Sequence, residues 1–298
     1  YSLLYAIYEQ HRDAKGGAAN YGKMPDAEVL SIVTEVAGIS GSVDLNSDAP
    51  TLHFQQATHE RQRPLNLVII LEESLGAEFV GSLGGKDLTH NLDKMEDDGM
   101  WFEQLYATGT RSARGIEAVI SSFPPTSRRS VVKLAETQDN FFTIAGFLKD
   151  QGYDTSFIYG GEAHFDNMRR FFLNNGFQTI IDEGDYETPE FMGSWGVSDE
   201  DLFVKADEHF KRKGDQPFFS LVFSSSHHEP FDIPAGKVEI RSGPDGPRDM
   251  AVAYADHALG RFFDLARSSD YYENTVFLVV ADHNSRVYGD QLIPIERF

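Results

Sequence analysis

The chain has 298 residues, 41% of them apolar, which is enough to bury one large core or two modest ones. Its 47 acidic and 26 basic residues give a net charge of −21, which argues against a nucleic-acid partner because phosphate backbones need a cationic surface. It contains no cysteine, which excludes disulfides and thiolate metal sites, and no run of the ~18–20 apolar residues that span a bilayer.

The first 60 residues are predicted to form a helical segment followed by a linker. Tyr1–Gln10 is amphipathic, and Asp26–Gly38 has helical periodicity. Gly41–Thr51 is rich in Ser, Asp, Gly and Pro, which is the composition of a linker. Residues 61–298 are then expected to form one globular domain, with its core starting near Pro64.

Beyond Pro64, strands and helices alternate. Continuous apolar runs predict buried strands, and a 3.6-residue period predicts helices. The predicted strands are Leu67–Leu71, Trp101–Ala107, Thr155–Tyr159, Phe218–Ser224 and Thr275–Val280. The predicted helices are Asn91–Gly99, Gly115–Ser121, Phe141–Gln151, Asn167–Asn175, Asp199–Arg212 and Met250–Ser268. This alternation is typical of an α/β sandwich with a central, largely parallel sheet flanked by helices.

Metal-ligating side chains follow two of these strands. Asp282 and His283 follow the last strand, and Glu72 and Glu73 follow the first. Ligands of such sheets bind outside the carboxyl ends of the strands, and divalent cations take carboxylate and imidazole ligands. Neighbouring residues on an extended segment point to opposite sides, so we expect only one of the two glutamates to face the metal, with Glu73 as the first candidate and Glu72 as its competitor. The alternative for Asp282 and His283 is a polar turn that closes a strand.

A hydroxyl flanked by arginines lies between these motifs, in the run from Gly109 to Gly115. Ser112 is the predicted nucleophile, and it would need a base or a metal for activation near neutral pH. Arg111 and Arg114 are placed to hold phosphoryl oxygens. Alternatively, Thr110 and Ser112 cap the helix that follows. Both interpretations are compatible, because a helix N-terminus also attracts anions.

A pair of histidines, His227 and His228, follows the strand Phe218–Ser224. From that position either ring could protonate a leaving oxygen or contact a phosphate. The alternative is a solvated loop histidine.

Together these motifs resemble the lipoteichoic acid synthase and phosphoglycerol transferase branch of the alkaline phosphatase/sulfatase superfamily. The resemblance runs from about residue 66 to residue 298, and its specificity comes from seven motifs that occur in the family's order. The motifs are Asn66-Leu-Val-Ile-Ile-Leu-Glu-Glu73-Ser, Leu88-Thr-His-Asn91-Leu-Asp93-Lys, Tyr106-Ala-Thr-Gly-Thr-Arg-Ser112-Ala-Arg-Gly, Tyr159-Gly-Gly-Glu-Ala-His-Phe165-Asp-Asn-Met, Trp195-Gly-Val-Ser-Asp199, His228-Glu-Pro-Phe and Ala281-Asp282-His283.

The resemblance implies roles for individual residues. Glu73, Asp282 and His283 match the family's metal ligands, and Ser112 matches the nucleophile, which also contacts the metal. His228 matches a histidine that contacts substrate. The implied cofactor is one divalent ion, Mn²⁺ first, with Mg²⁺ and Zn²⁺ as alternatives.

The chain departs from the family pattern at several positions. Serine stands at 112 where threonine is common, which leaves Thr110 as a rival nucleophile. Phe165-Asp-Asn-Met168 stands where relatives bind glycerol phosphate with a tryptophan and an arginine, so we expect a different headgroup pocket. Trp195 is predicted to contact the substrate together with His228. Relatives continue with further strands after the point that corresponds to Phe298, which implies a fold that is truncated here.

The function implied by the resemblance is a metal-dependent phosphotransferase. It would move a phosphoglycerol-type headgroup from a phospholipid to the hydroxyl of a glycan or polyol acceptor through a covalent phosphoserine. The alternatives are a phosphodiesterase, phosphatase or sulfatase-like hydrolase of the same fold, and a catalytically silent domain that binds headgroups or glycans. Relatives carry this catalytic domain on a membrane anchor, and the resemblance implies that this chain corresponds to the domain without its anchor. The implied location is the extracytoplasmic face of the bacterial inner membrane, in the periplasm or outside the cell.

Overall fold

The computed structural model describes residues 22–36, 38–39, 50, 63–124, 126, 129–238 and 246–284. Two compact units divide the chain: Tyr1–Pro64 with Thr126–Arg128, and Leu65–Pro125 with Arg129–Phe298. Of the predicted N-terminal elements, the helix Tyr1–Gln10 and all of the linker Gly41–Thr51 except Pro50 lie outside the described residues.

The described part of the first unit contains the helix α2 (Asp26–Val36), which confirms helical structure within the predicted range. Its first turn carries Asp26 and Glu28, whose negative charges stabilise the N-terminal end of a helix. Among the described helices of the chain, none combines the length and apolarity needed to cross a membrane.

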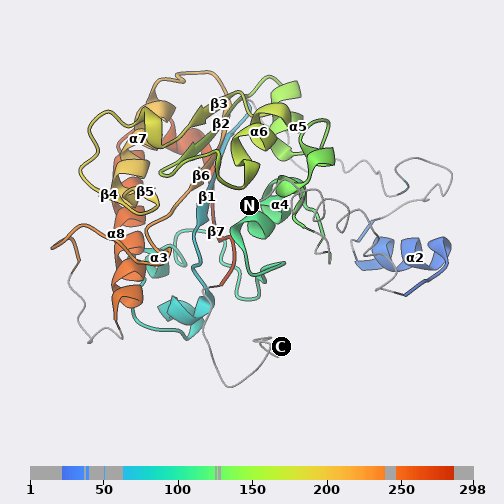
Figure 1. Ribbon diagram of the computed structural model, residues 1–298, viewed down its shortest axis with the longest axis horizontal. Coiled ribbons are helices and arrows are strands. Elements are labelled where there is room, and N and C mark those ends of the chain that lie inside the picture. Colours follow the sequence, from blue (N-terminus) through green and yellow to red (C-terminus); the bar gives the residue numbers. More distant parts are fainter. Residues whose placement is uncertain are drawn as a thin grey trace, which may run out of the picture. The chain divides into compact units, whose positions relative to one another are not determined.

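The second unit is built on a parallel sheet of five strands (Figure 1). The strands are β1 (Asn66–Glu72), β2 (Asp154–Tyr159), β3 (Thr179–Ile181), β6 (Phe218–Phe223) and β7 (Thr275–Ala281). Their order across the sheet is β3-β2-β6-β1-β7, and every pair is parallel. β6 is therefore the central strand, and β1 lies between β6 and the edge strand β7. This arrangement confirms the predicted α/β sandwich.

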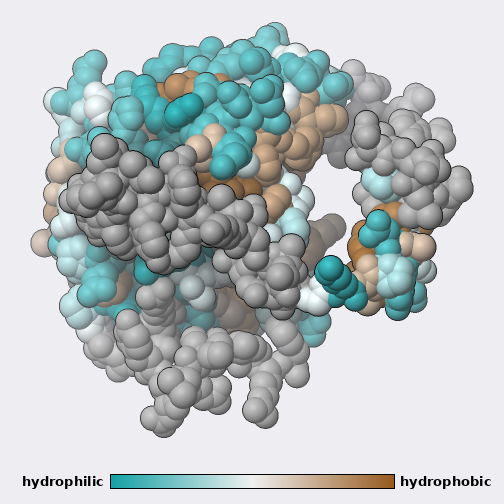
Figure 2. Space-filling model, turned by 45° about the vertical axis from the view of Figure 1, so that its right-hand side comes forward, coloured by the Kyte–Doolittle hydropathy of each residue, from teal (hydrophilic) through white to brown (hydrophobic). Residues whose placement is uncertain are grey.

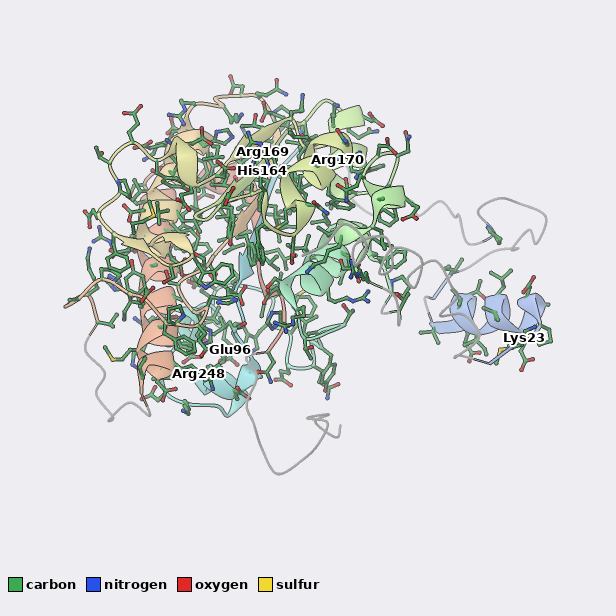
Figure 3. All side chains as sticks on the ribbon, viewed as in Figure 1. Lys23, Glu96, His164, Arg169, Arg170 and Arg248 are labelled. Carbon is green, nitrogen blue, oxygen red and sulfur yellow. The ribbon has the colours of Figure 1, made fainter. Side chains whose placement is uncertain are left out.

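Helices cover both faces of the sheet, as the pleat of β1 requires. Val68 and Ile70 point into a core that includes residues of α3 (His90–Lys94), α7 (Asp199–Lys211) and α8 (Pro247–Arg267). Ile69 and Leu71 point into the other core, with α4 (Ser112–Ser121), α5 (Ile144–Asp150) and α6 (Met168–Asn174). Side chains fill the space between the sheet and both helical layers (Figure 3). The exposed surface in Figure 2 is largely hydrophilic, with patches of apolar side chains.

Short elements connect these layers. The strands β4 (Met192–Gly193) and β5 (Gly196–Val197) form a small antiparallel hairpin. The 3₁₀ helices are η2 (Ala77–Phe79), η3 (Gly81–Leu83), η4 (Val131–Lys133), η5 (Ala135–Thr137), η6 (Phe165–Asn167), η7 (Glu183–Asp185) and η8 (Tyr272–Asn274).

The predicted strand Trp101–Ala107 is wrong, because this segment has no regular structure. Its apolar residues come in adjacent pairs rather than in alternation, and no described strand pairs with it. β-propensity alone does not make a strand without a neighbour. The sequence also did not indicate β3, β4 or β5, which have only two or three residues each.

Candidate active site

Three side chains with metal-ligating atoms converge at the carboxyl ends of β1 and β7. Glu73 directly follows β1, and Asp282 and His283 directly follow β7. Ligand atoms of these three buried residues lie within 4.8 Å of one another. They meet because β1 and β7 are parallel neighbours whose last residues, Glu72 and Ala281, are in register. Two carboxylates and an imidazole form a donor set that suits a divalent cation.

The ring of His283 is oriented for coordination through Nε2. Its Nδ1 lies 2.8 Å from the carbonyl oxygen of Asn284, so Nδ1 is the nitrogen that carries the proton. Nε2 then presents its lone pair 3.4 Å from Asp282 Oδ2 and 3.9 Å from Glu73 Oε1. A carbonyl that holds the second ring nitrogen is a common way to orient a metal-binding histidine.

Asp282 has a buried oxygen that no described protein group satisfies. Its Oδ1 accepts hydrogen bonds from the backbone N–H groups of Ser74 at 2.8 Å and His283 at 2.7 Å. Its Oδ2 is buried and has no hydrogen-bond partner within the described residues. Burial, and then the negative charge of Glu73, raise the pKa of Asp282 well above its usual value. A cation between the two carboxylates would relieve their repulsion and satisfy this oxygen, so the residues fit a metal ion.

Ser112 lies beside these ligands as the first residue of α4. Its Oγ is 3.1 Å from Glu73 Oε2 and 3.4 Å from His283 Nε2. Arg111 is the N-cap residue, with an extended φ of −148°. The helix therefore begins three residues before the predicted Gly115. A hydroxyl, a metal-ligating cluster and a helix N-terminus, which favours anions, thus meet in one place.

Gly115 allows α4 to approach Asp282 closely. A Cβ atom at position 115 would lie 2.3 Å from the carbonyl oxygen of Asp282 and 2.6 Å from its Cα and Cβ. No side chain fits in that space. The absence of a side chain on Gly115 therefore places Ser112 next to the metal-ligating residues.

Glu72, the alternative to Glu73, is not part of this cluster. Its Oε2 accepts a hydrogen bond from Ser224 Oγ at 2.8 Å, and its Oε1 has no partner in the described part of the chain. Burial, followed by the nearby negative charge of Asp199, raises the pKa of Glu72 to about 8. Glu72 is therefore largely a neutral carboxylic acid at neutral pH.

The residues around Ser112 differ in how they are held. Arg114 is committed to an ion pair with the fully buried Glu117, at 2.5 Å, and Glu117 also accepts the N–H of Val131. Arg111 is exposed beside Ser112. Thr110 is also exposed, and no hydrogen bond joins it to the cluster in the described structure. A phosphate contact by Arg114 would have to compete with Glu117, whereas Arg111 has no such constraint.

The two histidines after β6 have different surroundings. His227 is buried, and its Nδ1 lies 3.2 Å from the backbone carbonyl oxygen of Glu73. Burial lowers the pKa of His227 to about 4, so its ring is neutral and supports the Glu73 backbone. His228 is half-buried and packs on Trp195, with ring centroids 4.0 Å apart. His228 is therefore the histidine that a substrate could reach.

Sequence reasoning missed two serines that hold the metal-ligating residues. Ser74, at a positive φ of 54°, donates its Oγ hydrogen to Glu73 Oε1 at 2.6 Å and its N–H to Asp282. Ser224 accepts the N–H of Glu73 at 2.9 Å and donates to Glu72. The signal for Ser74 was its place directly after Glu73. Nothing in the spacing pointed to Ser224.

The neighbouring glutamates provide a matched pair of variants. We expect Glu73→Gln to weaken Mn²⁺ binding at least about 10-fold, because it removes an anionic ligand from the cluster. Glu72→Gln should change the affinity by less than about twofold, since Gln is close in shape and charge to a protonated Glu. Isothermal titration calorimetry measures both affinities. Equal effects of the two substitutions would contradict the assignment.

Glu72 also predicts a pH dependence of stability in metal-free protein. Its pKa is raised from 4.5 to about 8, so the native state binds its proton more tightly than the unfolded state. The contribution of Glu72 to the free energy of unfolding should be fully present below pH 4.5 and fall as pH rises to about 8, by at most ~1.4 kcal/mol per pH unit. Urea unfolding in chelator should show a flatter profile for Glu72→Gln. Superimposable profiles would contradict the burial argument.

Gly115→Ala should damage the site and the fold together. Its methyl group would collide with the Asp282 backbone, so we expect a loss of about 1–3 kcal/mol in the free energy of unfolding and weaker Mn²⁺ binding. Gly184→Ala is the control, because the nearest atom to its Cβ would be 3.7 Å away. Denaturant unfolding and calorimetry give both quantities. Unchanged metal affinity in Gly115→Ala would show that α4 can move without affecting the cluster.

Several known proteins are similar to this chain over most of its length. Phosphoglycerol transferase I of Xanthomonas campestris pv. campestris is 24% identical over 94% of this chain and 43% of its own length. The chain thus spans less than half the length of the curated relatives it matches. A solved protein of the alkaline phosphatase superfamily from Vibrio parahaemolyticus is 54% identical, with a TM-score of 0.85, over 92% of this chain and 67% of that protein. The lipoteichoic acid synthase LtaP from Listeria monocytogenes is 25% identical, with a TM-score of 0.71, over 86% of this chain and 62% of LtaP.

The sulfatase family model matches residues 65–294, which include Glu73, Ser112, Asp282 and His283. This match covers most of the second unit and its whole described sheet. It confirms the resemblance that the sequence motifs indicated. The chain belongs to the sulfatase family, within the alkaline phosphatase superfamily.

Proposed function

We propose that this chain is the catalytic part of a metal-dependent phosphotransferase. It would transfer a phosphoglycerol-type headgroup from a phospholipid to the hydroxyl of an acceptor, through a covalent phosphoserine at Ser112. The observation that supports this most is the position of Ser112 Oγ, 3.1 Å from Glu73 Oε2 and 3.4 Å from His283 Nε2. The name of one relative, phosphoglycerol transferase I, supports phosphoglycerol as the group that is transferred.

Glu73, Asp282, His283 and Ser112 would hold one divalent ion, which we propose is Mn²⁺, with Mg²⁺ or Zn²⁺ as substitutes. When bound, the ion would neutralise phosphate charge and lower the pKa of the serine hydroxyl. The chain has no cysteine, whose thiolate would favour softer metals. The ligand atoms of the cluster are oxygen and nitrogen, which suit these three ions.

The protein residues would carry out the first half-reaction as follows. Ser112 Oγ forms a bond to the donor phosphorus while the bond from phosphorus to the diacylglycerol oxygen breaks. The N–H groups of the first turn of α4 and the guanidinium of Arg111 favour the anionic phosphate. The hydroxyl proton that Ser112 loses balances the proton that the departing oxygen gains, and we assign its delivery to the half-buried His228, since the ring of His227 is engaged with the Glu73 backbone.

The remaining assignments follow from this proposal. Residues 61–298 would form the catalytic domain, and residues 1–60 would be a helical segment and linker leading from a membrane anchor outside this sequence. A phospholipid donor requires access to a membrane surface. We therefore place the domain at the extracytoplasmic face of the bacterial inner membrane.

Ser112→Ala should lower diacylglycerol release from phosphatidylglycerol by at least ~10³-fold, because it removes the nucleophile. Ser121→Ala, at the far end of the same helix, is the matched control and should keep normal turnover. Chelation should abolish release and added Mn²⁺ should restore it. In a reaction quenched before acceptor is added, intact mass should show wild-type protein carrying one phosphoglyceryl group.

Three results would count against this proposal. Release that persists in Ser112→Ala but is lost in Thr110→Ala would make Thr110 the nucleophile. Water as the sole acceptor, whatever polyol is supplied, would make the enzyme a hydrolase. A metal-loaded wild-type protein that binds the headgroup without turnover would identify a binding domain.

A further inference from the structure

The loop that follows β6 is held at two points by the motif Trp195-Gly-Val-Ser-Asp199. At the end of the motif, the buried Asp199 accepts the N–H groups of Ser225 at 2.9 Å and Ser226 at 3.2 Å through Oδ1. Its own N–H donates to Ser226 Oγ at 3.1 Å. At the beginning of the motif, the indole of Trp195 packs on His228, with ring centroids 4.0 Å apart. One short motif therefore anchors the loop that carries the proposed general acid, both near its start and at His228 itself.

One carbonyl oxygen joins the two rings. The carbonyl oxygen of Glu229 lies 2.8 Å from Trp195 Nε1 and 2.8 Å from His228 Nδ1. A carbonyl oxygen only accepts hydrogen bonds, so both nitrogens donate to it. Nδ1 is therefore the ring nitrogen of His228 that carries the proton in this arrangement. The structure shows no hydrogen bond between Nε2 of His228 and the described residues.

The backbone around Trp195 is itself fixed by the β4–β5 hairpin. Gly196 has a φ of 106°, and a Cβ atom there would lie 2.0 Å from the carbonyl oxygen of Gly160. The hairpin therefore lies directly on the segment that follows β2. On the other side of Trp195 in the sequence, Ser194 donates its N–H and its Oγ hydrogen to Asp232 Oδ2, at 2.9 and 2.5 Å. Both neighbours of Trp195 are thus held in place.

The indole of Trp195 uses its polar atom inside the protein. Nε1 is bonded to Glu229, and Phe165 meets the ring edge-on, with centroids 5.4 Å apart. Trp195 has no second hydrogen-bonding atom to offer a ligand. The tautomer of a neutral imidazole is set by the hydrogen bond that one of its nitrogens makes. The contacts of Trp195 with His228 and with its Glu229 acceptor therefore favour one tautomer of His228.

We propose that Trp195 is a positioning residue, which fixes His228 so that Nε2 is the nitrogen that transfers the proton. This inference rests on the transferase function proposed above, and it gives Trp195 this role in place of a contact with substrate. In the first half-reaction, the Nε2–H bond breaks while an O–H bond forms on the departing diacylglycerol, and the proton that Ser112 loses replaces it. In the second half-reaction, Nε2 takes the proton of the acceptor hydroxyl and Ser112 regains one, so no other reactant is needed.

Nitrogen NMR reads the tautomer of His228 directly, because protonated and unprotonated ring nitrogens have widely separated chemical shifts. The whole chain is labelled with nitrogen-15 histidine and recorded at about pH 8.5, where an ordinary imidazole is neutral. His228→Gln identifies the signals of His228 by their loss. We expect a protonated Nδ1 and an unprotonated Nε2 for His228 in the wild-type protein.

Two substitutions separate the indole N–H from the indole ring. Trp195→Phe keeps an aromatic ring but removes the donor, and Trp195→Leu removes both. We expect the His228 signals to move toward a mixture of the two tautomers, further in Trp195→Leu than in Trp195→Phe. Trp101→Phe is the matched control and should leave these signals unchanged, because Trp101 Nε1 has no hydrogen-bond partner in the described residues.

The kinetics of diacylglycerol release from phosphatidylglycerol separate positioning from binding. Poor placement of a catalytic group costs up to about 100-fold in rate, so kcat should fall about 10-fold in Trp195→Phe and about 100-fold in Trp195→Leu. KM should stay within about twofold of the wild-type value, because the proposed role involves no contact between Trp195 and the substrate. If circular dichroism shows that Trp195→Leu is unfolded, the wild-type spectrum and Trp195→Phe still decide.

A wild-type spectrum with the proton of His228 on Nε2 would overturn the inference. An unchanged kcat in Trp195→Phe would also overturn it, and a raised KM with an unchanged tautomer would make Trp195 a substrate contact instead. Absence of diacylglycerol release from the wild-type protein would refute the proposed function. The nitrogen spectra would then still show whether Trp195 fixes the ring of His228.

Discussion

Two buried carboxylates lie against one another at the ends of adjacent strands, and the surrounding site is arranged around their shared charge. Asp282 and Glu73 are each hydrogen-bonded by Ser74, but Oδ2 of Asp282 stays buried without a described partner. Uncompensated charges in a protein interior are costly. The orientation of His283, with Nε2 facing both carboxylates, makes a cation the simplest compensation.

Two further buried acids, Glu72 and Asp199, lie outside the metal-ligating cluster. Glu72 and Asp199 both have raised pKa values, about 8 and about 6, mainly because they are buried. Glu72 is thus neutral through protonation, while Asp199 accepts two backbone N–H groups, from Ser225 and Ser226. The neighbouring residues Glu72 and Glu73 therefore differ in charge. Glu72 is neutral because it carries a proton, whereas Glu73 belongs to the cluster that fits a cation. A protein with a net charge of −21 could still attract a phosphate if a cation bound at the cluster supplied positive charge there.

Most of the fold could be predicted from the sequence, because long apolar strands and amphipathic helices carry a strong periodic signal. Strand alternation indicated that only one of Glu72 and Glu73 faces the metal, the family resemblance selected Glu73, and the structure places Glu73 in the cluster. Contacts between distant segments could not be predicted in the same way. The ion pair that engages Arg114, the close approach at Gly115 and the packing of Trp195 on His228 all depend on tertiary structure. The mistaken strand at Trp101–Ala107 has the same origin, since strand formation requires a partner.

The register between β1 and β7 has a consequence for biosynthesis. Glu72 pairs with Ala281, and Ser74 bonds to Asp282 across 208 residues of chain. A ribosome delivers the first of these partners long before the second, and a contact of such long range forms late because the intervening loop must close first. A nascent chain whose last strand is still inside the ribosome lacks the contribution of Asp282 and His283 to the cluster. Metal binding at this cluster would therefore mark the end of folding.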